Sequence, residues 1–293
     1  MEIEPVAFFR SPFPTKFGIP RQSGLVPDLA GTIVFREGFN REEGIRGLEG
    51  FAYIWLIWGF SANPDGGTAA GTTPGTSVHR EGETTGGRYG GSLLVRPPRL
   101  GGNRSVGVFA SRSPFRPNGL GLSAVRLEAI GEGPVLHVRG ADLLDGTPIY
   151  DIKPYLPYTD AHPQAAAGFT DSVPRNRLHV RFPRALQETF LEIRRSPLPA
   201  PACDAPDQPF GTEGRTEPRQ EAGEALETLV AVLEQDPRPA YQQTPGRRYG
   251  LAFDGADIGF RVEGNTLTVT DVKEFSPEGD VSKSLSEPAQ KEN

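Results

Sequence analysis

The sequence predicts a mainly β protein with two domains, the second of them small and of α+β type. Thirty-six glycines and 29 prolines among 293 residues favour short strands joined by turns over long helices. Short apolar runs bounded by glycine, proline and asparagine recur through the first half of the chain. From Ala161 the composition shifts toward proline, alanine and polar residues. We therefore expect one domain over residues 1–163 and another over residues 164–275.

The first domain carries a series of strand patterns. They cover Val6–Phe9, Thr32–Phe35, Phe51–Phe60, Val106–Ala110, Leu122–Ile130, Val135–Arg139 and Ile149–Lys153. Phe51–Phe60 is apolar throughout, which predicts a strand buried on both faces. Asn40 is expected to cap a brief helix ending near Leu48. Asp65–Gly91 consists almost entirely of Gly, Thr, Ser and charged residues, so we expect a flexible insertion there.

The second domain is predicted to combine helices with a small β meander. Its expected elements are a strand Leu178–Phe182, helices Arg184–Arg195 and Glu221–Gln235, and strands Tyr249–Phe253, Ile258–Val262 and Thr266–Val269. A Pro/Gly-rich linker over about 196–220 separates the helices. The polar residues 276–293 are expected to be a disordered tail.

Composition and motifs exclude several classes of protein. A net charge of -6 argues against a general nucleic-acid coat. The single cysteine, Cys203, rules out an internal disulfide and favours a cytoplasmic setting. The N-terminus has acids where a signal peptide has basic residues, and no apolar run is long enough to span a membrane. The four histidines lack metal-ligand spacing, so we expect no metal. No phosphate-loop, GxGxxG or GxSxG motif occurs, which argues against the nucleotide-binding and serine-hydrolase classes that these motifs mark.

Positive charge is concentrated locally. Arg96, Arg99, Arg104, Arg112 and Arg116 follow one another with no acid before Glu128. Between two strand patterns, Ser111–Gly121 contains Pro114, Pro117 and Asn118-Gly119, which stiffen a loop. Guanidinium groups held still in this way bind carboxylate or phosphate in a bidentate manner.

Four polar, Pro/Gly-stiffened segments lie beside strands: Pro20–Gln22, Ser61–Asn63, Arg112–Asn118 and Asp142–Lys153. Each also has a plainer interpretation. The two aspartates Asp142 and Asp145 can serve only a turn, and the arginines can be surface charges of little energetic worth. The strand period places Asp151 and Lys153 on one face, where they can form an exposed ion pair, with Tyr150 and Ile152 on the other. Loops at one end of a barrel or sandwich are nevertheless where sites are usually built.

These segments carry a resemblance to a known family. RSPFPTKFGIPRQSGLV, EGIRGLEGFAYIWLI, VRPPRLGGNRSVGVFASRSPFRPNGLGLS, DLLDGTPIYDIKPYLPY and EQDPRPAY resemble the TrmO (TsaA-like) family. The family consists of tRNA methyltransferases that move a methyl group from S-adenosylmethionine to N6 of threonylcarbamoyladenosine beside the anticodon, at position 37. The resemblance spans the chain except for the insertion, the linker and the tail.

The resemblance implies a β-barrel methyltransferase domain of non-Rossmann type that acts as a homodimer, with the cofactor near the subunit interface. It also implies which residues touch S-adenosylmethionine: Pro20, Arg21, Gln22, Ser61, Ala62, Arg112, Leu122, Asp142, Leu143, Leu144 and Asp145. Where the family often has His-Gln or Asp-Gln, this chain has Ser61-Ala62, so only backbone contact is expected there.

The chemistry of the transfer suggests further roles. The acceptor nitrogen is conjugated to a carbonyl and is therefore a weak nucleophile. Our hypothesis is that Asp151 acts as a base and that Lys153 or Arg116 polarises the carbonyl. The expected contacts to tRNA are Arg96, Arg99, Asn118, Tyr155, Asp236, Arg238 and Tyr241. Without the resemblance, Arg238–Tyr241 would simply be a helix exit.

Two alternatives use the same residues. One is a methyltransferase of the same scaffold acting on another RNA base or a small molecule. The other is a non-catalytic RNA-binding barrel, which would not bind S-adenosylmethionine.

Overall fold

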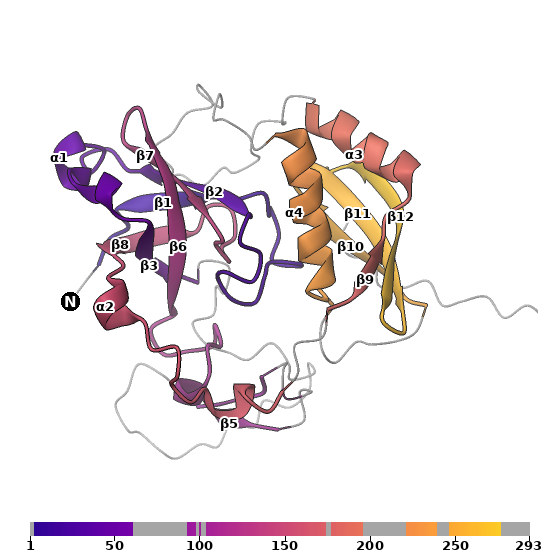
Figure 1. The fold of residues 1–293 in the computed structure, drawn as a ribbon, viewed down its shortest axis with the longest axis horizontal. Coiled ribbons are helices and arrows are strands. Elements are labelled where there is room, and N and C mark those ends of the chain that lie inside the picture. The colour runs from indigo at the N-terminus through magenta and orange to yellow at the C-terminus, as the bar shows by residue number, and fades with distance from the viewer. Residues whose placement is uncertain are drawn as a thin grey trace, which may run out of the picture.

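The protein consists of two β units that lie side by side (Figure 1). The computed structural model describes residues 3–60, 93–97, 100, 104–173, 177–195, 221–238 and 246–276. The predicted insertion, the linker and nearly all of the tail lie outside these residues, as do Ser61, Ala62, Arg99 and Tyr241.

The first unit is a closed six-stranded barrel with the order β1-β2-β7-β6-β3-β8. Its strands are β1 (Ala7–Arg10), β2 (Ala30–Phe35), β3 (Tyr53–Gly59), β6 (Leu120–Gly131), β7 (Val135–Arg139) and β8 (Pro148–Pro154), all paired antiparallel. Closure leaves no free sheet edge. The predicted β-barrel is confirmed, and β7 has the predicted bounds.

Strand β3 alternates between the barrel interior and its outer surface. Ile54, Leu56 and Trp58 are buried, whereas Tyr53 is 45% exposed. The prediction of a strand buried on both faces is therefore wrong. The physical reason is that an antiparallel barrel fills only its interior, so the apolar side chains between the buried ones face outward.

A β-bulge interrupts the pairing of β8 with β3. Trp58 pairs with Ile149 and Ile57 pairs with Asp151, so Tyr150 is the additional residue. As a result Ile149 and Ile152, three residues apart, both pack against the barrel core. Asp151 and Lys153 share a face as predicted, and the ring of Tyr150 covers Gly59.

Shorter elements differ from the predictions at turns. Helix α1 (Glu42–Ile45) has Arg41 and not Asn40 at its N-cap, and Gly47, with a φ of 88°, separates it from the 3-10 helix η1 (Leu48–Gly50). Instead of one strand over 106–110 there is β5 (Val106–Gly107), which pairs with β4 (Leu94–Val95), followed by the 3-10 turn η3 (Val108–Ala110). After β8 come α2 (Pro157–Asp160) and η4 (Gly168–Thr170).

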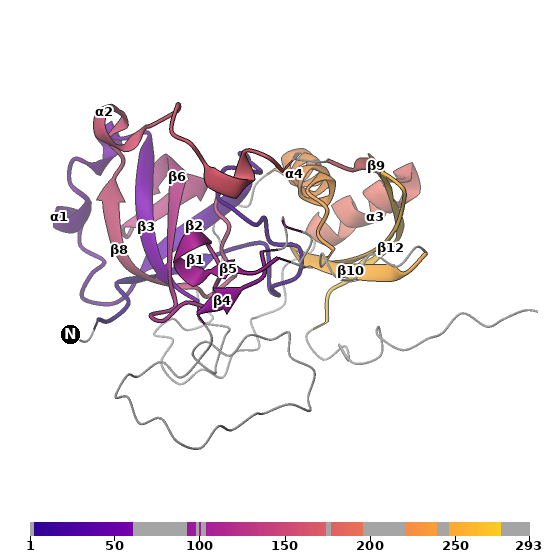
Figure 2. The same ribbon diagram turned by 90° about the horizontal axis from the view of Figure 1, so that it is seen from below.

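The second unit is a four-stranded sheet covered by two helices on one face (Figures 1 and 2). The strand order is β10-β11-β12-β9, with β9 parallel to β12. The elements are β9 (His179–Arg181), α3 (Arg184–Arg195), α4 (Ala222–Glu234), β10 (Arg248–Phe253), β11 (Ala256–Glu263) and β12 (Thr266–Glu274). The predicted combination of two helices with a meander is confirmed, since apolar stripes on both helices bury Phe190, Leu229 and Leu233.

The loop 11–29 of the barrel packs into the core of the second unit. Phe13, Val26 and Leu29 belong to the same buried cluster as Leu251. Phe13 meets Phe253 edge to face at 5.2 Å. Gly18 has a φ of +92°, and a Cβ there would lie 2.1 Å from Cδ1 of Leu251, so no side chain fits. The core of the second unit thus includes residues from the first domain.

Candidate functional site

Two sets of hydrogen bonds involve predicted cofactor residues of the barrel loops. Arg112 donates from Nη1 to Oε1 of Gln22 at 2.6 Å. Asp142 accepts a hydrogen bond from Oγ of Ser123 at 2.6 Å, and Ser123 in turn accepts one from Nε1 of Trp58 at 3.0 Å. The positive charge of Arg112 stabilises the charged form of Asp142, which indicates that the two side chains lie near each other. The structure therefore brings Gln22, Arg112 and Asp142 together from three separate segments.

Burial raises the pKa of the Asp142 carboxyl above its ordinary value. The Ser123 hydroxyl, backbone N–H groups of Asp142 and Ser23, and the charge of Arg112 oppose this rise. A half-buried carboxylate of this kind gains strongly from a ligand that donates a hydrogen bond, such as a hydroxyl or an ammonium group.

The arginine loop is stiffened by its own hydrogen bonds. The hydroxyl of Ser111 donates to O of Val108 at 2.9 Å, and Arg116 donates from Nη1 to the carbonyls of Ser111 and Ser113 at 3.2 and 3.3 Å. Arg116, proposed as a polarising group, thus braces the loop that carries Arg112. Asn118 is exposed at the loop's far end.

The residues of the segment Asp142–Asp145 have different contacts. Leu143 is buried in the barrel core, and the carbonyl of Leu144 accepts a hydrogen bond from the Thr147 hydroxyl. Asp145 accepts one from the backbone N–H of Ser11 at 3.1 Å and lies 3.7 Å from Nη1 of Arg10. Asp145 therefore has contacts of the turn-stabilising kind, whereas Asp142 faces Arg112.

The segment Pro20–Gln22 is attached to the second domain. Pro20 is buried, and the exposed Arg21 donates from Nη2 to the carbonyl of Arg238 at 3.0 Å. The guanidinium of Arg238 forks onto Asp236, with contacts of 2.7 and 2.8 Å, and is 9% exposed. Asp236 and Arg238, both predicted to contact tRNA, thus lie next to the cofactor segment and bind each other.

Three further predicted residues, Leu122, Asp151 and Lys153, lie on the outer surface of the barrel. They come from β6 and β8, which flank β3 in the barrel (Figure 2). Leu122 pairs with Ile57, which pairs with Asp151. One step along the strands, Ala124 pairs with Trp55 and Trp55 with Lys153. Nζ of Lys153 lies 3.1 Å from Oδ2 of Asp151. The predicted cofactor residue Leu122, 56% exposed, thus shares a face with both catalytic candidates.

Two further tRNA candidates are described. Arg96 is exposed beside the β4–β5 ribbon. The ring of Tyr155 contacts Tyr53 and Trp55, with centroids 6.0 and 5.4 Å apart.

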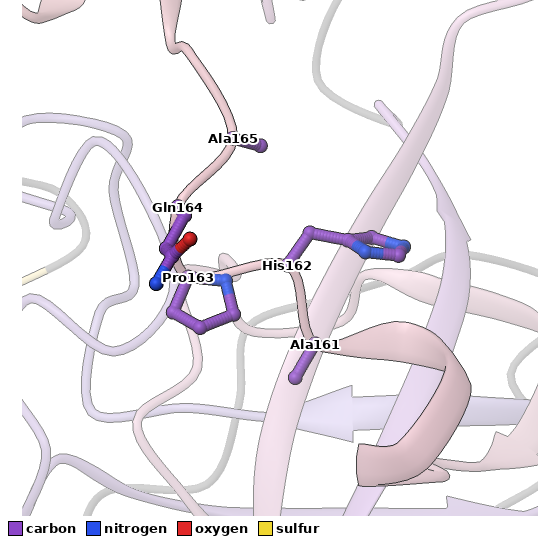
Figure 3. Close-up of a pocket in the computed structure, with 5 residues that line it drawn as sticks. All are labelled: Ala161, His162, Pro163, Gln164 and Ala165. Carbon is purple, nitrogen blue, oxygen red and sulfur yellow. The ribbon is translucent and has the colours of Figure 1, made fainter.

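A hollow of about 390 Å³ lies elsewhere (Figure 3). It is lined by Ala161, His162, Pro163, Gln164 and Ala165, from the segment after α2, and contains none of the predicted site residues. Its lining offers one imidazole and one amide, and we do not assign the cofactor to it. Across the described ranges there is also no cluster of three His, Cys, Asp or Glu side chains that could hold a metal, and no helix long and apolar enough to cross a membrane.

Trp58, Ser23 and Ser123 were not predicted as site residues. Ser123 and the backbone N–H of Ser23 donate hydrogen bonds to Asp142, and Trp58 donates one to Ser123. The sequence does contain a signal for Ser123: a hydroxyl residue among the otherwise apolar inward positions of its strand, where it needs a partner. No comparable signal marks Ser23, whose backbone is the donor.

A closed antiparallel barrel with an arginine, an amide and a half-buried carboxylate converging at its loops defines a cofactor-binding β-barrel, distinct from parallel-sheet dinucleotide folds. The model of the tRNA-methyltransferase O N-terminal domain matches residues 8–161, and that of the TrmO C-terminal domain matches residues 211–275. The chain belongs to the TrmO family.

Similar proteins extend over nearly the whole chain. A putative S-adenosylmethionine-dependent methyltransferase, RcsF, of Pseudomonas aeruginosa is 38% identical over 87% of this chain and 90% of its own length. The tRNA (adenine(37)-N6)-methyltransferase of Escherichia coli is 31% identical over 89% of this chain and 93% of its own. The crystal structure of TrmO from Pseudomonas aeruginosa superposes with a TM-score of 0.63 at 30% identity, covering 94% of this chain and 97% of that one.

Proposed function

We propose that this protein transfers a methyl group from S-adenosylmethionine to N6 of the adenine at position 37 of tRNA, in its threonylcarbamoyl form. The observation that carries the proposal is the convergence of Gln22, Arg112 and Asp142 in a member of the TrmO family. The activity named for the Escherichia coli relative, methylation at N6 of adenine 37 in tRNA, supports the same position and atom.

The residues fit the proposed cofactor. Arg112, already aligned by Gln22, can fork the methionine carboxylate, and Asp142 can accept hydrogen bonds from the ribose diol or the amine. Leu122, the residue before Ser123 on β6, offers exposed apolar surface. When bound, S-adenosylmethionine supplies a methyl group activated on a sulfonium. The protein's main task is then alignment of the two reacting atoms, which can be worth up to roughly 7 to 11 kcal/mol.

We propose that Asp151 and Lys153 assist the acceptor. As N6 takes up the methyl group that leaves the sulfonium, the Asp151 carboxylate would accept the proton lost from N6. Lys153, 3.1 Å away, can polarise the carbonyl attached to N6. Lys153 suits this role better than Arg116, whose guanidinium is engaged by the carbonyls of Ser111 and Ser113.

The protein is further proposed to act as a cytoplasmic homodimer. Leu93, Leu94 and Phe109 are large, exposed and apolar, and they precede Arg112 in the chain. Such a group of side chains is typical of a surface covered by another subunit. Light scattering should give twice the chain mass, and Phe109→Asp should give the monomer mass.

The decisive experiment is methylation with labelled S-adenosylmethionine and two tRNA preparations, one containing threonylcarbamoyladenosine and one lacking it. Nucleoside mass analysis should find label in the modified nucleoside only. Cofactor binding without label would indicate a different substrate, and absence of cofactor binding would indicate a non-catalytic RNA-binding barrel.

The catalytic roles are tested by single-turnover transfer at saturating cofactor. Asp151→Asn should slow transfer about 100-fold or more if Asp151 is the base, and Lys153→Met should slow it as well. The matched control is Glu188→Gln, because Glu188 and Arg184 form an exposed ion pair on α3, also at 3.1 Å. Rates within a few-fold of the control for both variants would reject the assignment.

A further inference from the structure

Aromatic side chains gather on the outer surface of the barrel where β3 begins. Tyr53 and Trp55 of β3 contact Tyr155, which directly follows β8, with ring centroids 6.0 and 5.4 Å apart. Tyr158 lies three residues further along, in α2. We call these four residues the aromatic surface.

The aromatic surface is held in place by hydrogen bonds. Nε1 of Trp55 donates to Oδ2 of Asp160 at 2.9 Å, and the backbone N–H of Leu156 donates to the same oxygen at 2.9 Å. These two bonds lower the pKa of Asp160, which keeps its carboxylate charged. The backbone N–H of Tyr155 donates to the carbonyl of Tyr53. The rings of Tyr53, Trp55 and Tyr155 therefore contact one another before any ligand binds, which reduces the entropy lost on binding.

The aromatic surface is also open. Tyr53 is 45% exposed and Tyr158 is 86% exposed. Neither ring is needed to fill the barrel, whose interior is occupied by Ile54 and Leu56 on the opposite face of β3. Exposed aromatic residues in one place usually mark a binding surface.

Cations flank the aromatic surface. Arg126 pairs with Tyr53 across β3 and β6, and Lys153 pairs with Trp55 across β3 and β8. The two basic side chains are 43% and 62% exposed, and each lies within ion-pair distance of an exposed aspartate, Asp28 at 3.7 Å and Asp151 at 3.1 Å. Aromatic faces beside cations are the pattern by which proteins bind unpaired nucleotides, through stacking and phosphate attraction.

We propose that the aromatic surface stacks unpaired anticodon-loop bases next to the acceptor adenosine, an inference that rests on the proposed function. Leu122 and Arg126 are four residues apart on β6, so the two ends of this face are separated by about 13 Å. A base one or two nucleotides from an acceptor held beside Leu122 and Asp151 then reaches Tyr53, which pairs with Arg126 at the far end of this face, while Tyr158 follows in α2. The aromatic surface would thereby hold the loop open while the acceptor base is unstacked.

The test uses Tyr53→Ala and Tyr158→Ala, each with its phenylalanine counterpart. Stacking on one residue is typically worth a factor of about five to 150 in affinity. We expect the alanine variants to weaken binding of the modified tRNA by about fivefold or more, with the phenylalanine variants restoring it. Because tyrosine is uncharged, the slope of affinity against salt should not change. Phe39→Ala is the matched control, since Phe39 is 47% exposed on a loop after β2, a strand that does not adjoin β3 or β8.

Cofactor binding and molecular mass are measured on every variant. Unchanged tRNA affinity in both alanine variants, while the wild type binds and methylates tRNA, would overturn the proposal. An alanine variant with half the molecular mass of a dimeric wild type would also overturn the proposal. Loss of the dimer would mean that the second subunit, and not tRNA, contacts the aromatic surface. If the wild type bound cofactor but not tRNA, the proposed function itself would fail, a distinct result.

Discussion

The arginines of one barrel loop and those of the C-terminal domain are used in opposite ways. In the barrel loop, Arg112 and Arg116 donate to neutral oxygens, those of the Gln22 amide and of two backbone carbonyls. Neither makes an ion pair with a carboxylate of the described residues. In the C-terminal domain each of three arginines meets an aspartate: Arg194 with Asp254, Arg238 with Asp236 and Arg248 with Asp271.

The difference separates charges that hold the fold from charges available to a ligand. A cation aligned by neutral acceptors keeps its geometry without being neutralised, so an incoming carboxylate or phosphate finds it preorganised. A cation already forked onto an aspartate would have to break that pair first.

Replacing Arg194 should damage the C-terminal domain most. Its side chain is buried against Asp254, so Arg194→Met leaves a carboxylate with a missing partner, at a cost of about 3 to 5 kcal/mol. Urea unfolding would measure this. The double variant Arg194→Met, Asp254→Asn should recover much of the loss, and equal stability of the single and double variants would contradict the pairing.

Replacing Arg112 should affect ligand binding and not stability. Arg112→Gln removes a charged donor to the cofactor carboxylate, so S-adenosylmethionine affinity should fall about tenfold or more. The melting temperature should stay near that of the wild type because the guanidinium is exposed. Isothermal titration with Arg104→Gln as the control would measure it, and equal affinities would remove Arg112 from the site.

Arg238 is predicted to act both in the fold and in tRNA binding. Arg238→Lys keeps the charge but cannot fork onto Asp236, so we expect a stability loss of about 1 to 3 kcal/mol. If Arg238 also contacts tRNA phosphate, Arg238→Ala should lower the salt dependence of tRNA binding by about one ion. Binding measured over a range of salt concentrations separates the two roles.

Asp142→Asn should have the smallest and most pH-dependent effect on stability. Because burial raises the pKa of Asp142, its contribution to stability is full below the ordinary pKa and is lost as pH rises through the raised value. At neutral pH the asparagine variant should therefore be about 0.5 to 1 kcal/mol more stable, while binding S-adenosylmethionine more weakly. The stability difference should vanish in acid, and a pH-independent difference would contradict this origin.

Local patterns predicted the regular elements well. The helix Arg184–Arg195 and the strand Val135–Arg139 have the predicted bounds because their apolar periodicity is uninterrupted. Turns were harder, since Gly47 ends α1 early by taking a φ that other residues rarely adopt. The bulge at Tyr150 had no local signal because it depends on pairing with β3.

The site was predicted in its members but not in its contacts. The resemblance names Gln22, Arg112 and Asp142, yet their convergence depends on which strands neighbour one another in the closed barrel. The outer face shared by Leu122, Asp151 and Lys153 likewise follows from register across β6, β3 and β8. Register of this kind is a property of paired strands and cannot be read from one strand alone.

The loop 11–29 is shared by the cofactor site and the C-terminal core. It holds Pro20–Gln22 at one side and buries Phe13 and Val26 at the other, with Gly18 pressed against Leu251. Any ligand that favours one arrangement of this loop must, by thermodynamic reciprocity, change the stability of the distant sheet by the same free energy. The C-terminal domain thus acts on the loop 11–29 as a covalently attached allosteric effector, and truncating the domain removes that effector.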